Sequence, residues 1–183
     1  MNDFKHIFLL CLATIFCLCS CRESEIQQKS ETPEQRREIL EKANRFIVKQ
    51  EAELIGDYIE RHKLDVTETG TGLRYQIVKQ GDSEPVEEND VVTLDYETCF
   101  LTGDLVYSSK KDGQKTFRVG KGGVESGLEE VVLHLHKNDV AVAILPSHLA
   151  FGLLGDGKKI PARAALVYRI KVVDIQKYRN EKV

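Results

Sequence analysis

The chain has 183 residues, of which 42% are hydrophobic, and a formal net charge of −3 at pH 7. Acidic and basic residues are interspersed, so the sequence does not predict the strongly basic surface that neutralises nucleic-acid phosphates. The length that remains after an N-terminal targeting segment suits one ordinary domain with a modest extension.

The N-terminus is typical of an export signal. Basic residues precede an apolar stretch over 7–18, which is shorter than the roughly 20 apolar residues of a membrane-spanning helix. The stretch ends in Leu18-Cys19-Ser20-Cys21, which resembles a bacterial lipobox. We therefore expect a signal peptide over 1–20, cleavage before Cys21 and attachment of lipid to its sulfur, with a retained signal anchor as the alternative.

Cysteine usage agrees with export. Of the five cysteines, three would leave with the signal and Cys21 would carry lipid, so that Cys99 alone remains as a thiol. No disulfide can form within such a mature chain, and the fold must rest on its hydrophobic core, with Cys99 as a small buried hydrophobe. We expect a protein of the bacterial cell envelope, anchored in the outer membrane and facing the periplasm, with exposure at the cell surface as the alternative.

A polar tether over 21–32 and a long helix over 33–63 follow the lipid site. Thr32 and Gln35 form a capping box, and Pro33 suits the first helical position because its missing N–H costs nothing there. Apolar residues then recur at three- and four-residue steps, which predicts one apolar face. That face indicates either helix-to-helix dimerisation or a helix that packs partly on its own domain and otherwise spaces it from the membrane.

Beyond the helix the hydrophobic period changes from helical to alternating, which indicates strands. Strands are predicted over 73–79, 91–100 and 166–173, and one short helix over 125–133. The sequence therefore predicts an α+β domain over 70–177, in which a small antiparallel sheet wraps around one short helix.

Several motifs in this domain resemble those of a known family. They are a first strand, a glycine-led segment, a helix start and a flap, with the sequences Gly72-Leu73-Arg74-Tyr75-Gln76-Ile77-Val78, Gly103-Asp104-Leu105-Val106-Tyr107-Ser108-Ser109, Val124-Glu125-Ser126-Gly127-Leu128 and Pro146-Ser147-His148-Leu149-Ala150-Phe151-Gly152. In this order they resemble the FKBP-type peptidyl-prolyl cis-trans isomerases over 72–175. The gliding-motility-associated lipoproteins of that family are a closer likeness, because they combine a lipobox, a charged helix and a pocket segment with Tyr-Ser in place of Asp-Ser. The later part of the flap, Gly155-Asp156-Gly157-Lys158-Lys159-Ile160, also resembles that group.

The resemblance implies a pocket that holds a substrate proline, with a backbone donor for the substrate carbonyl. The residues implied to act on the twisting bond are Tyr96, Tyr107, Phe117, Glu125 through its backbone N–H, Phe151 and Tyr168. Those implied to contact the substrate are Val106, Val124, Leu128 and Ile160. Such a site needs no acid or base, because an apolar pocket and one donor favour the twisted amide over the planar one.

This sequence departs from the family at the centre of that pocket. Tyr107 replaces an aspartate, Leu128 a tryptophan and Phe151 a tyrosine, while Val106 and Glu125 replace phenylalanine and isoleucine. We expect weak or selective isomerase activity. The alternatives are a prolyl-peptide-binding chaperone with little turnover and a structural subunit of an envelope or motility complex.

The sequence implies no cofactor and no metal. His134 and His136 would share one face of an extended segment, but no third ligand stands at zinc-like spacing. The expected partners are proline-containing exported polypeptides, the lipid bilayer through acylated Cys21 and a second copy through the helix over 33–63. Nucleic acid is not expected.

Overall fold

A computed structural model describes residues 32–81 and 84–178. The predicted signal peptide, Cys21 and the predicted tether up to residue 31 lie outside the described residues. The chain divides into two compact units, 1–41 and 42–183. Within the described ranges, no helix combines the length and the apolar character needed to cross a membrane.

Helix α2 runs from Pro33 to His62, as the sequence predicts. The predicted capping box is present, because the Gln35 N–H donates to Thr32 Oγ1 at 3.3 Å and the Thr32 N–H donates to Gln35 Oε1 at 3.1 Å. The helix ends where Lys63 adopts a positive φ of 51°. Local side-chain and backbone geometry therefore determines both ends of the helix.

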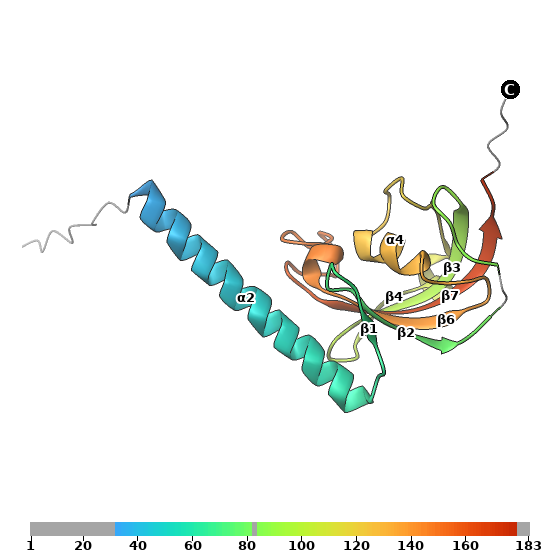
Figure 1. Ribbon diagram of the computed structural model, residues 1–183, viewed down its shortest axis with the longest axis horizontal. Coiled ribbons are helices and arrows are strands. Elements are labelled where there is room, and N and C mark those ends of the chain that lie inside the picture. The colour runs from blue at the N-terminus through green and yellow to red at the C-terminus, as the bar shows by residue number, and fades with distance from the viewer. Residues whose placement is uncertain (1–31, 82–83, 179–183) are drawn as a thin grey trace, which may run out of the picture. The chain divides into compact units, whose positions relative to one another are not determined.

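The second unit contains a seven-stranded antiparallel sheet that curves around a short helix, α4 (Figure 1). The strands lie in the order β1-β2-β6-β7-β3-β4, and β5 pairs with β3. This arrangement confirms the predicted α+β fold. The strands are β1 (Thr67–Glu68), β2 (Arg74–Lys79), β3 (Val91–Phe100), β4 (Leu105–Ser108), β5 (Lys115–Arg118), β6 (Val140–Leu145) and β7 (Leu166–Gln176), and the short helices are α3 (Ser109–Asp112), α4 (Ser126–Val132) and a 3₁₀ turn (Ser147–Leu149).

Strand β6 is the longest of the strands that the hydrophobic pattern did not predict, the others being β1, β4 and β5. Its sequence, Val-Ala-Val-Ala-Ile-Leu, contains no polar residue and so lacks the alternation that identifies a half-exposed strand. The strand is central, paired with β2 and β7. Ala141 and Ala143 face the inner core, while Ile144 packs in a second cluster on the outer face. Burial of both faces explains the continuous apolar run.

The inner face of the sheet packs against α4. Leu128, Val131 and Val132 of this helix are fully buried. Gly127 allows the close approach, because a Cβ atom there would lie 2.7 Å from Cγ of Leu145. Cys99 is buried, as expected, and burial raises the pKa of its thiol.

The last turns of α2 cover part of the outer face. Ile55 and Tyr58 are buried against Ile144, Ala165 and Val167. These contacts lie within the second unit, which begins at residue 42. This end of the helix therefore belongs to the folded domain. The result agrees with the alternative in which part of the helix packs on its own domain.

Truncation of Ile55 tests this attachment. Ile55 is 1% exposed, whereas the neighbouring Leu54 is 58% exposed. We expect Ile55→Ala to lower the free energy of unfolding by about 2–5 kcal/mol, and Leu54→Ala to change it by less than about 0.5 kcal/mol. Urea denaturation followed by circular dichroism measures both. Equal losses in the two variants would contradict the packing.

Candidate active site

A cleft of about 400 Å³ lies where β3, β4, α3 and β5 meet the start of α4 and the loop over 150–161. This loop follows the 3₁₀ turn and is the part of the flap that lines the cleft. A second cavity of about 380 Å³ adjoins it, and both are lined by Lys115, Glu125 and Phe151. The remaining lining residues are Tyr96, Tyr107, Asp112, Asp156 and Lys158 in the first cavity and Gly123, Val124 and Ala150 in the second.

The structure brings the sequence-predicted site residues together. Six of them are buried in one core cluster, namely Tyr96, Val106, Phe117, Leu128, Ile160 and Tyr168. Tyr107, Val124 and Phe151 are partly buried and pack against that cluster. Because Leu128 and Tyr168 are almost fully buried, the half-exposed trio supplies most of the apolar surface that a ligand could reach.

The floor of the cleft holds an ion pair. The Glu125 carboxylate, whose side chain is 3% exposed, lies 3.1 Å from Nζ of Lys115 and accepts a hydrogen bond from the hydroxyl of Tyr168. Burial, together with the adjacent Glu125 charge, raises the pKa of Tyr168, so the hydroxyl stays a donor at all ordinary pH values. The carboxylate thus has both a cation and a neutral donor.

The Lys115 ammonium also lies on the aromatic side chains of the floor. Its Nζ is 5.2 Å from the ring centre of Tyr96 and 5.9 Å from that of Tyr168. Both distances fall within the range of cation–π attraction. The Lys115 ammonium therefore lies over Tyr96 and Tyr168, two of the aromatic rings predicted to line the proline pocket.

The Glu125 backbone lies at the N-cap of α4. Its carbonyl accepts the N–H groups of Leu128 and Glu129 in the first turn of α4. Among the backbone hydrogen bonds of the residues that the structure describes, none has the Glu125 N–H as its donor. This donor is therefore available to a ligand.

A second carboxylate reaches the cleft from the flap. Asp156 Oδ2 accepts a hydrogen bond from the Tyr107 hydroxyl, and its Oδ1 accepts the N–H groups of Lys158, Lys159 and Ile160. Burial alone would raise the pKa of Asp156, but these donors outweigh it and lower the pKa to about 2. The hydrogen bond to Asp156 raises the pKa of Tyr107 to about 12. The pair therefore remains a phenol and a carboxylate near neutral pH.

The flap is tied to β4 by short contacts. Lys159 Nζ donates to the Val106 carbonyl at 3.1 Å and lies 4.5 Å from the ring centre of Tyr107. Gly155 has a positive φ of 70°, and a Cβ atom there would lie 2.1 Å from the carbonyl oxygen of Ile160. The tight turn at Gly155 thus directs the Asp156 side chain toward β4.

Sequence analysis assigned no role in the site to three polar residues of the cleft, Asp112, Lys115 and Asp156. Lys115 carried a usable signal, because it stands two residues before Phe117 in β5 and so shares its face of the strand. Asp156 carried a weaker one, since an aspartate between two glycines favours a turn in which its side chain accepts backbone N–H groups.

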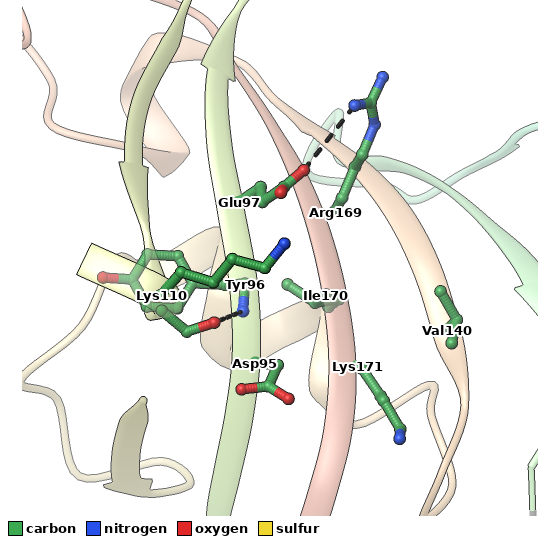
Figure 2. Close-up of a pocket in the computed structure, with 9 residues that line it drawn as sticks. Asp95, Tyr96, Glu97, Lys110, Val140, Arg169, Ile170 and Lys171 are labelled. Atoms are coloured by element: carbon green, nitrogen blue, oxygen red, sulfur yellow. Dashed lines mark hydrogen bonds and ion pairs between the residues drawn. The ribbon is translucent and has the colours of Figure 1, made fainter. Parts of the chain in front are cut away.

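A further cavity, of about 260 Å³, lies on the outer face of the sheet (Figure 2). There Asp95 pairs in register with Lys171, and Glu97 with Arg169, across β3 and β7. The Glu97 and Arg169 side chains approach to 3.9 Å and are largely exposed, so this ion pair contributes little to stability. Of its lining, only Tyr96 also lines the 400 Å³ cleft.

Comparison with known proteins identifies the family. The family model described as FKBP-type peptidyl-prolyl cis-trans isomerase matches residues 82–173, half of the chain. The chain belongs to this family. The expectation from the sequence motifs is therefore confirmed at the level of the family.

Individual relatives within the FKBP-type family are also similar to this chain. It is 32% identical to a probable FKBP-type peptidyl-prolyl cis-trans isomerase FkpA of Neisseria meningitidis, over 79% of this chain and 57% of that protein. It is 27% identical to the peptidyl-prolyl cis-trans isomerase Mip of Coxiella burnetii, over 64% of this chain and 50% of that protein. The chain thus spans about half the length of the curated relatives that it matches.

Solved structures of the FKBP-type family have the same fold. The crystal structure of FkpA from Escherichia coli aligns with a TM-score of 0.58 at 23% identity, over 80% of this chain and 74% of that one. The crystal structure of AtFKBP13 gives the same TM-score at 22% identity, over 61% of this chain and 98% of that one. These likenesses establish the fold.

The Tyr107–Asp156 hydrogen bond should make the stability of the protein depend on pH. Because the folded-state pKa of Asp156 is lowered, its contribution to stability is complete above the ordinary value of 3.8 and is lost as the pH falls toward 2. The raised pKa of Tyr107 makes its contribution complete below 10 and lost as the pH rises through 12.

The variant Tyr107→Phe tests the assignment. We expect it to raise the pKa of Asp156 above about 2 but to leave it below 3.8, because three backbone donors remain. Carboxyl ¹³C chemical shifts followed over pH measure this value. An unchanged Asp156 titration would show that the phenol does not bind the carboxylate in solution.

Proposed function

We propose that this protein is a peptidyl-prolyl cis-trans isomerase that binds X-Pro segments of exported polypeptides in the cleft and assists their folding. The observation that carries the proposal is the available Glu125 N–H beside half-exposed aromatic side chains. Family membership supports the same reaction.

The reaction requires little chemical equipment. Rotation about an X-Pro bond meets a barrier of about 20 kcal/mol because the amide loses its resonance. Tyr107, Val124 and Phe151 offer apolar contacts to the proline ring, and the Glu125 N–H offers a hydrogen bond to the carbonyl. These contacts accelerate rotation if they bind the twisted amide more strongly than the planar one. Each difference of about 1.4 kcal/mol in binding free energy between the two forms gives about a tenfold gain in rate.

The proposed residue roles follow the position of each side chain. Tyr96, Phe117 and Tyr168 form the buried aromatic floor, and Val106, Leu128 and Ile160 belong to the same buried cluster. Tyr107, held by Asp156, takes the place that an aspartate has in the family. The phenol is already donating to Asp156, so it offers a weaker polar contact to the substrate than a free donor would.

Prolyl-peptide binding with little turnover is the second candidate function. The observation that favours it is the Lys115–Glu125 ion pair on the aromatic floor, which a proline ring must share or displace. A binder of this kind would act as a chaperone or as a subunit of an envelope or motility complex. Turnover on a proline peptide separates the two functions.

The isomerase proposal predicts a loss of activity on truncation of Phe151. We expect the full chain to accelerate cis-trans relaxation of X-Pro peptides in a protease-free assay, and Phe151→Ala to reduce kcat/KM by roughly tenfold or more, because about 1.5 kcal/mol or more of apolar contact is lost. Leu154→Ala is the matched control, since Leu154 lies in the same flap and is 89% exposed.

The control defines the outcomes of this assay. Leu154→Ala should keep nearly all of the wild-type activity. If no acceleration occurs while labelled prolyl peptides still bind, the second candidate function replaces the first. If Phe151→Ala and Leu154→Ala behave alike, the reaction does not occur in this cleft.

We further propose that the chain is an envelope lipoprotein. The layout is a signal peptide over 1–20, a tether over 21–32, the helix over 33–63 and the isomerase domain over 70–177, with lipid on Cys21. The lipobox and the short apolar stretch support export and lipid anchoring, and we propose the periplasmic side of the outer membrane as the place of the anchor. The flap sequence supports placement among the gliding-motility-associated lipoproteins.

Lipid attachment predicts a labelling result. In a bacterial host fed radiolabelled palmitate, the chain should incorporate label, and Cys21→Ser should abolish it because the acylated sulfur is gone. Cys19→Ser, two residues earlier in the same motif, is the matched control and should retain the label. Equal labelling of all three proteins would exclude Cys21 as the attachment site.

Dimerisation through α2 is part of the same proposal. Several large apolar side chains of this helix are exposed, namely Ile39, Leu40, Phe46, Val48 and Leu54. A second copy of the helix is the partner that would cover them most directly, since matching apolar faces pack well. The alternative role as a spacer leaves these side chains exposed to water.

A further inference from the structure

The Lys115–Glu125 ion pair divides the candidate active site. Both residues line the 400 Å³ cleft and the 380 Å³ cavity beside it, so the pair stands between the two spaces. The Lys115 ammonium lies over the rings of Tyr96 and Tyr168 at 5.2 and 5.9 Å. The aromatic floor is therefore already covered by a cation in the protein without substrate.

We propose that this ion pair is a specificity determinant, and that it makes the cleft prefer peptides with a lysine or arginine next to the proline. The inference rests on the proposed function, because it concerns which prolyl peptides the same cleft accepts. When such a peptide binds, its lysine or arginine side chain takes the place of Lys115 beside the Glu125 carboxylate.

The two members of the pair differ in their freedom to move. The Lys115 side chain is 24% exposed, whereas that of Glu125 is 3% exposed and held by the Tyr168 hydroxyl. A proline ring that settles on the aromatic floor can push the flexible lysine toward solvent. The buried carboxylate cannot follow it.

The carboxylate left behind selects the substrate. A buried charge that loses its partner is strongly destabilised, and the single hydrogen bond from Tyr168 does not replace a cation. A lysine or arginine beside the substrate proline restores the pairing. A peptide without such a cation leaves Glu125 unpaired and binds more weakly.

Acidic peptides gain little in compensation. An acidic side chain at the rim could pair with the displaced Lys115 or with the exposed Lys158, which also lines the cleft, but exposed ion pairs contribute little. The same side chain would face the carboxylates of Asp112, Glu125 and Asp156, which all line the cleft. The cleft should therefore rank basic peptides above neutral ones and acidic peptides last.

The test uses three fluorescein-labelled peptides that differ only in the residue before proline, which is lysine, leucine or glutamate. They are titrated into the full chain by fluorescence polarisation, and their isomerisation rates are measured in parallel. We expect the lysine peptide to bind about tenfold more tightly than the leucine peptide, and the glutamate peptide to bind most weakly.

Substitutions of Glu125 and Lys115 test whether this ion pair causes the preference for the lysine peptide. Glu125→Gln keeps the shape of the side chain and can still accept from Tyr168, and it should reduce the lysine-over-leucine preference to less than about twofold. Lys115→Met should enlarge the preference, because Glu125 then lacks its own cation. Lys121→Met, which removes an exposed lysine outside both cavities, is the control and should keep the wild-type ranking.

The outcomes separate this inference from the proposed function. Preferential binding of the lysine peptide without any isomerisation would support the inference and contradict catalysis. Isomerisation with equal affinity for the three peptides would support catalysis and overturn the inference. If Glu125→Gln keeps the preference for the lysine peptide, the inference is overturned as well. If none of the three peptides binds, both the inference and the proposed function fail.

Discussion

The close packing of α4 against the inner face of the sheet is the contact on which the candidate site depends. Gly127 permits this approach, since any side chain there would collide with Leu145. The packing fixes the start of the helix beside β5 and β7, so that the Glu125 N–H and carboxylate both reach the cleft. If a methyl group at position 127 pushed the helix outward, the Glu125 N–H and carboxylate would both move away from Lys115 and Tyr168.

The polarity of the cleft follows from that placement. Glu125, a buried glutamate at the N-cap of α4, must have partners, because an isolated carboxylate is strongly destabilised in an apolar interior. Lys115 and Tyr168 provide them from two different strands. The aromatic floor is consequently combined with an internal cation, which distinguishes this cleft from a wholly apolar one.

Local patterns predicted much of the fold and fewer of the polar contacts. The capping box located the start of α2, and the alternation of apolar and polar residues located β2, β3 and β7. Strand β6 escaped because both of its faces are buried. The motifs brought the aromatic site residues together, but the partners of Tyr107 and Glu125 depend on tertiary folding. Asp156 is 49 residues from Tyr107, and no local period connects them.

Asp156 lies in a loop and not in the sheet, and this affects how the site can change during evolution. Loops accept substitutions and length changes more readily than paired strands, because fewer backbone contacts depend on them. The carboxylate near Tyr107 can therefore be moved, removed or replaced by altering the flap alone, while the strands that carry the aromatic floor stay intact. The acidic group and the apolar floor of this site are thus separately mutable parts of one protein.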